Sequence, residues 1–134
     1  MIRTDRRGAI RTTAAALAAL AIPAPLLAGG SRPALFIFDS RMPGAAVVAQ
    51  HWRAQGVPVL DRMAVDLGHA WRGDIAQQLR AGGGSVAGLT LWMDSYICET
   101  FGRDFGLALR RAPAGAAAPW QHWELQMQPG RANG

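Results

Sequence analysis

The order of hydrophobic and polar positions after residue 33 predicts alternating strands and helices. The run 34–38 is apolar throughout and rich in β-forming residues, which is typical of a strand buried on both faces of a sheet. Trp52 and the apolar residues one and two turns before it fall on one side of a predicted helix. A second short strand follows at 57–60, and its Pro58 favours an edge position or a strand start.

The second half of the chain continues this alternation and ends in two predicted strands. The predicted elements are a helix marked by Trp71, Ile75 and Leu79, a strand at 85–91, a helix at 94–105, and strands at 107–111 and 120–128. The order β-α-β-α-β-α-β-β predicts a small α/β domain of three layers, with a mainly parallel sheet and an antiparallel C-terminal hairpin.

Residues 1–30 have a different composition from the rest. Arg6 and Arg7 are followed by one variable residue, an apolar pair and Arg11, and an alanine- and leucine-rich stretch comes next. This segment resembles a twin-arginine signal peptide, although Ala9 stands where a bulkier apolar residue is usual. The resemblance implies export to the periplasm by the twin-arginine translocation machinery, with cleavage near Ala28 to Gly30.

Prolines interrupt the apolar stretch well before the ~20 residues that a membrane span needs, so we expect no permanent span. A signal that is kept as a membrane tether is the alternative. The chain then divides into a signal peptide at 1–30, one domain at 31–128 and a flexible tail at 129–134.

The distribution of charge and the cysteine count argue against some functions and structural features. The formal net charge is +5, but the leader contributes +3 of it, and the remaining arginines are scattered with no dense run. A nucleic-acid role is therefore not expected. Cys98 is the single cysteine, which excludes an internal disulfide and favours a buried packing role.

Candidate chemistry gathers where strands end, because ligands of open α/β sheets bind beyond the carboxyl ends of the strands. The candidates are Asp39, Ser40 and Arg41 after the first strand, Asp61 after the second, His69 on the connection that follows, and Trp92, Asp94 and Ser95 after the third.

Three carboxylates at successive strand ends could hold a hard cation or divide acid and base roles. Ser40 or Ser95 could act with His69 as nucleophile and base, and Arg41 could bind an anion together with free amides. The competing interpretation is that aspartate and serine cap helices at such junctions. The sequence has no G-x-S-x-G elbow and no zinc-ligand spacing, and it identifies no cofactor.

The leading hypothesis is an exported small α/β module that binds a partner protein or a small ligand without catalysis. The alternative is a periplasmic hydrolase-like enzyme with a carboxylate and histidine site at the strand ends. A pocket that joins several candidate side chains would favour the enzyme, and their dispersal would favour the binding module.

Overall fold

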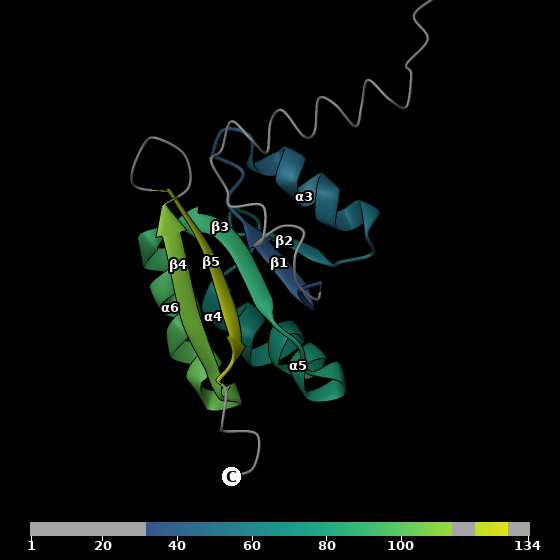
Figure 1. Cartoon of the computed structure of the whole chain (residues 1–134), viewed down its shortest axis with the longest axis vertical. Coiled ribbons are helices and arrows are strands. Elements are labelled where there is room, and N and C mark those ends of the chain that lie inside the picture. The colour runs from purple at the N-terminus through teal and green to yellow at the C-terminus, as the bar shows by residue number, and fades with distance from the viewer. Residues whose placement is uncertain (1–31, 114–119, 129–134) are drawn as a thin grey trace, which may run out of the picture.

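The computed structural model describes residues 32–113 and 120–128, which form one β-sheet with helices packed against it (Figure 1). The predicted signal peptide, its cleavage region and the tail at 129–134 lie outside the described residues. Within the described part, no helix is long and apolar enough to cross a membrane.

The described strands and helices follow the predicted alternation. The strands are β1 (Leu35–Phe38), β2 (Val59–Asp61), β3 (Val86–Leu91), β4 (Leu107–Pro113) and β5 (Trp120–Met127). The helices are α3 (Ala45–Ala54), α4 (Leu67–Ala70), α5 (Ala76–Gly82) and α6 (Trp92–Gly102). A π-helical turn, Trp71–Ile75, joins α4 to α5, and a 3-10 turn, Arg103–Phe105, extends α6.

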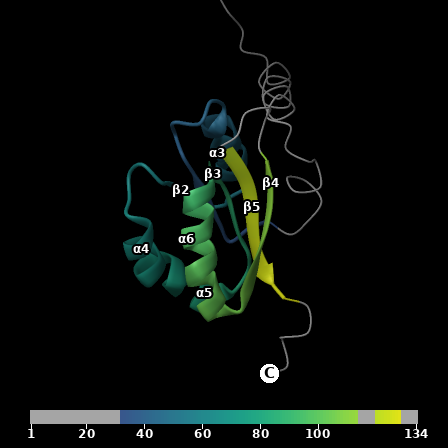
Figure 2. The same ribbon diagram turned by 90° about the vertical axis from the view of Figure 1, so that its left-hand side faces the viewer.

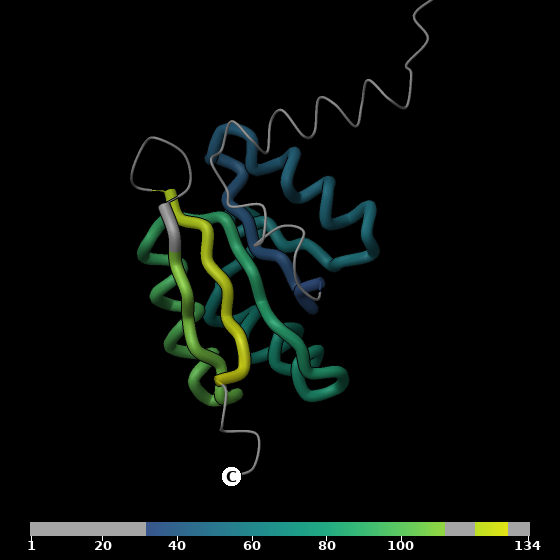
Figure 3. Tube along the Cα trace, viewed as in Figure 1, coloured from purple at the N-terminus to yellow at the C-terminus, as the bar shows by residue number. Residues whose placement is uncertain are grey.

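The sheet is mixed, and the expectation of a mainly parallel sheet is wrong. The strand order is β2-β1-β3-β5-β4, in which β1 pairs in parallel with β2 and β3, whereas β5 is antiparallel to both of its neighbours. Figure 3 shows β5, in yellow, running between β3 and β4. The last two strands are antiparallel, as predicted, but β5 enters the sheet interior instead of forming its edge. Its insertion makes two of the four ladders antiparallel.

Each face of the sheet carries its own hydrophobic core. Phe36 and Phe38 of β1 pack with α3 on one face, whereas Leu35 and Ile37 pack with residues of α4, α5 and α6 on the other. Figure 2 shows α4, α5 and α6 together on one side of the sheet. Alternate side chains of β1 thus pack into the cores on opposite faces of the sheet. For this reason the strand is apolar at every position.

Trp123 of β5 lies directly over Gly88 of β3. A Cβ atom added at Gly88 would lie 2.2 Å from Trp123 Cζ2, so only glycine leaves room for this indole. The indole Nε1 donates a hydrogen bond of 2.9 Å to Thr90 Oγ1, and Trp123 and Thr90 are both fully buried. The pair fixes β5 against β3 by packing and by a hydrogen bond.

Two of the buried titratable groups, Cys98 and His122, have strongly shifted pKa values. Cys98 on α6 is buried, as predicted, and its Sγ accepts a hydrogen bond of 3.3 Å from Trp71 Nε1. Burial raises the pKa of its thiol to about 12. His122 lies on the interior strand β5 and is buried, and burial lowers the pKa of its imidazole to about 4.

Candidate functional site

The carboxyl ends of β1 and β3 flank the point where the winding of the chain reverses. α3, which follows β1, covers one face, and α6, which follows β3, covers the other. Ligand sites of open α/β sheets lie at such a reversal. The residues that follow β1, β2 and β3 therefore form the candidate site, which we call the strand-end face.

Asp39 anchors Arg41 at the end of β1. Its carboxylate is buried and accepts hydrogen bonds from Arg41 Nε at 3.0 Å, from Nη2 at 2.7 Å and from the Arg41 backbone N–H at 2.9 Å. The Arg41 side-chain hydrogen bonds lower the pKa of Asp39 against the opposing effect of its burial. Asp39 thus stays ionised and holds an exposed guanidinium in place.

Asp61 closes the turn after β2. Its Oδ1 accepts hydrogen bonds from the backbone N–H groups of Ser40 at 3.2 Å and Met63 at 3.0 Å. Burial raises the pKa of Asp61, but the donors at Met63 and Ser40 outweigh it, so the pKa lies below its usual value. Asp61 therefore connects the loops after β1 and β2.

Asp94 does not cap α6, although capping was the competing interpretation for the aspartates and serines at strand ends. α6 begins at Trp92 without a side-chain cap, and Asp94 lies within its first turn. The buried carboxylate instead accepts a hydrogen bond of 2.9 Å from Arg62 Nε, and its Oδ2 has no hydrogen-bond partner among the described residues. Asp94 is thus paired with Arg62, which lies 32 positions earlier in the chain, and is not available as a helix cap.

The Ser95 hydroxyl takes part in two hydrogen bonds, neither of them with His69. The hydroxyl donates to the Trp92 carbonyl at 2.7 Å and accepts from Arg111 Nε at 3.0 Å. The Arg111 guanidinium lies 5.3 Å from the centre of the Trp92 ring, which stacks on Tyr96 with ring centres 5.7 Å apart. Ser95 therefore positions an arginine against an aromatic pair.

His69 lies apart from the serines on the short helix α4. Its backbone N–H donates to Asp66 Oδ1 at 2.7 Å, which makes Asp66 the cap of that helix. No hydrogen bond of the described residues joins its exposed ring to Ser40 or Ser95. Within the described ranges, no three His, Cys, Asp or Glu side chains cluster closely enough to hold a metal ion. The strand-end carboxylates are thus dispersed, each with its own donors.

The strand-end face also exposes large apolar side chains. Five large hydrophobic residues of the described part are exposed, and four of them lie on the loop after β2 or in the first two turns of α6. They are Met63, Trp92, Met93 and Tyr96, with relative exposures between 46% and 57%. Arg41, Arg62 and Arg111 lie among these elements, so the face combines aromatic, methionine and arginine side chains.

Sequence reasoning missed Arg62, Arg111, Met63, Met93 and Tyr96. Arg62 could have been found, because it directly follows Asp61 at a strand end. Arg111 could not, because its role depends on the packing of β4 beside α6, and nothing local encodes that arrangement.

The family models, the curated proteins and the solved structures were compared with the chain. None of them matches it.

Proposed function

We propose that this protein is a non-catalytic binding module whose strand-end face docks an acidic segment of a partner protein. The observation that carries the proposal is the exposure of Trp92, Tyr96, Met63 and Met93 beside three anchored arginines. Tryptophan, tyrosine, methionine and arginine are the residue types enriched in protein interfaces, and the first two and arginine dominate their binding energy.

On the strand-end face, two carboxylates are buried and the arginines that they hold are exposed, which favours an acidic partner. Asp39 and Asp94 are buried, whereas the guanidinium groups that they hold reach the surface. Each arginine is fixed through Nε, so it loses little side-chain entropy when a partner carboxylate binds its outer nitrogens. A partner therefore meets preorganised cations next to apolar side chains.

The same contacts count against the hydrolase alternative. The Ser95 hydroxyl proton is directed at a backbone carbonyl, and its oxygen accepts from a guanidinium, so no base is placed to activate it. The carboxylates of Asp39 and Asp61 accept hydrogen bonds from their own neighbours. These hydrogen bonds fix the conformation of the surface loops, as a binding module requires. The twin-arginine leader supports a periplasmic place of action for this module.

Site-specific photo-crosslinking in the native host tests the proposal. A benzophenone amino acid at Met63 or Met93 should give an adduct with the same partner, whereas one at the exposed Gln77 on α5 should give none. Tyr96→Ala, which removes half of the aromatic pair, should lower the adduct yield, and added salt should do the same.

The crosslinked partner segment should be rich in Asp and Glu. No adduct from either methionine, or equal adducts from Gln77, would overturn the proposal. An adduct with twice the mass of this chain would make a second copy the partner and would contradict the acidic-partner proposal.

A further inference from the structure

A separate hollow opens between the helical run from α4 to α5 and the C-terminal part of α6. Its volume is about 530 Å³, which is within the usual range of small-molecule sites, roughly 300–1,000 Å³. The lining residues are Trp71, Arg72, Ala76, Arg80, Phe101, Asp104 and Phe105. The strand-end face uses the opposite end of α6.

Aromatic rings form one part of this hollow. Trp71 and Phe101 are stacked, with ring centres 6.1 Å apart and planes 9° from parallel, and Phe105 lies 6.3 Å from Trp71. Trp71 is fully buried, but Phe101 and Phe105 are only half-buried. Two phenyl rings backed by a rigid indole thus remain accessible to a flat apolar ligand.

Two arginines give the hollow a positive character. Arg80 places its guanidinium 5.8 Å from the centre of the Phe105 ring. Beside Gly68, Arg72 Nη2 and Phe101 Cζ border the same space as Asp66 Oδ1, the cap of α4. Both arginines are exposed, and no ion pair joins either to an acid in the described residues. Asp104 is the single acid of the lining, so the sum of the lining charges is positive.

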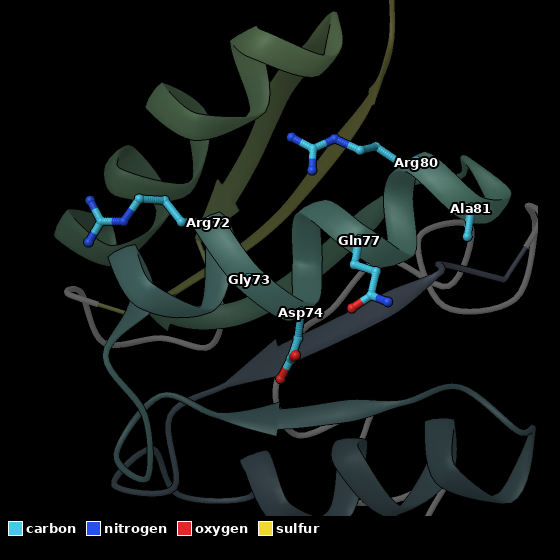
Figure 4. Close-up of a pocket in the computed structure, with 6 residues that line it drawn as sticks. All are labelled: Arg72, Gly73, Asp74, Gln77, Arg80 and Ala81. Atoms are coloured by element: carbon cyan, nitrogen blue, oxygen red, sulfur yellow. The ribbon is translucent and has the colours of Figure 1, made fainter.

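The two arginines leave their helical run on a different side from Asp74 and Gln77. Figure 4 shows this for a neighbouring hollow of about 580 Å³, in which Asp74 and Gln77 point away from both guanidinium groups. Trp71 and Arg72 lie side by side on the π-helical turn between α4 and α5, where Trp71 is buried and Arg72 is exposed. Such turns are frequent at functional sites.

From this combination we propose that the hollow between α5 and α6 binds a planar aromatic anion of the aryl carboxylate class. The ring contacts Phe101 and Phe105, and the carboxylate binds the guanidinium of Arg80 or Arg72. Arginine is suited to this task because its planar fork matches a carboxylate. The proposal is independent of the strand-end docking face.

Titration of the purified, ¹⁵N-labelled protein with naphthalene-2-carboxylate tests this site by NMR. Amide shifts should concentrate in residues 71–80 and 101–105. The neutral alcohol naphthalene-2-methanol should bind about tenfold more weakly, because it lacks the charge that the arginines recognise. Arg80→Gln should weaken naphthalene-2-carboxylate to a similar extent, whereas Arg53→Gln, an exposed arginine on α3, should leave its affinity unchanged.

Equal affinity for the acid and the alcohol would overturn the proposal. So would shifts that are spread over the surface, no saturable binding, or equal effects of Arg80→Gln and Arg53→Gln. Each of these results leaves the crosslinking experiment on the strand-end face unaffected, so failure of one proposal is distinguishable from failure of the other.

Discussion

Gly88→Ala should strongly destabilise the domain, although it adds a single methyl group. That methyl would lie 2.2 Å from Cζ2, 2.3 Å from Cε2 and 2.7 Å from Nε1 of Trp123. All three atoms belong to one rigid and fully buried ring, so no flexible end can move aside. The indole must therefore shift, or β3 and β5 must separate.

The expected cost has two parts. Overpacking in a well-packed core costs about 1–3 kcal/mol. A shift of the indole also breaks the Trp123 Nε1 hydrogen bond to Thr90, and a buried donor without its acceptor costs about 1–3 kcal/mol. Together these give a loss of about 2–6 kcal/mol, which is a large part of the roughly 5–15 kcal/mol that stabilises a small domain.

Urea unfolding followed by circular dichroism measures this loss. Gly73→Ala is the matched control, because a Cβ there meets no atom within 4 Å and alanine favours helix by up to about 1 kcal/mol. Adding Trp123→Phe to Gly88→Ala should recover part of the loss, since a smaller ring relieves the clash. A Gly88→Ala variant within about 0.5 kcal/mol of the parent would refute the reasoning.

Three further predictions concern other parts of the chain. Burial lowers the pKa of His122 to about 4, so up to about 3 kcal/mol of stability that is present above pH ~6.5 should be lost as the pH falls towards 4. In urea melts across this range, the stability of the parent relative to His122→Gln should fall by this amount. Arg62→Gln should lower the free energy of unfolding by about 1–3 kcal/mol, because it leaves the buried Asp94 carboxylate without its cation. In thermal melts, adding Asp94→Asn to this variant should restore stability. Lysine in place of both Arg6 and Arg7 should abolish the exported fraction in cell fractionation, and unchanged export would contradict the twin-arginine prediction.

The sequence predicts which elements form better than it predicts how they are ordered. The apolar run of β1 reflects burial on both faces, and Pro58 favours an edge strand because it has no backbone N–H to donate. Both are local signals, and both agree with the structure. Nothing local encodes the insertion of β5 between β3 and β4, because alternation along a strand shows which face is buried and not which strand lies beside it.

The same limit applies to the candidate site. The strand-end rule selected Asp39 and Asp94, but their partners are Arg41, which is a neighbour in sequence, and Arg62, which is distant. α6 begins at Trp92, two residues upstream of the predicted start, and Asp94 pairs with Arg62 instead of capping the helix. Helix caps are local signals, and a tertiary ion pair can override them.

The thiol of Cys98 can report on local unfolding of the core, because it reacts with an alkylating reagent only when the core opens. A buried sulfur with a pKa of about 12 is almost entirely protonated at neutral pH, and it is shielded from reagents by α6 and the Trp71 ring. Because no second cysteine competes for the label, its alkylation rate follows exposure of this part of the core. When closing is faster than labelling, that rate gives the free energy of opening without any added denaturant or engineered probe.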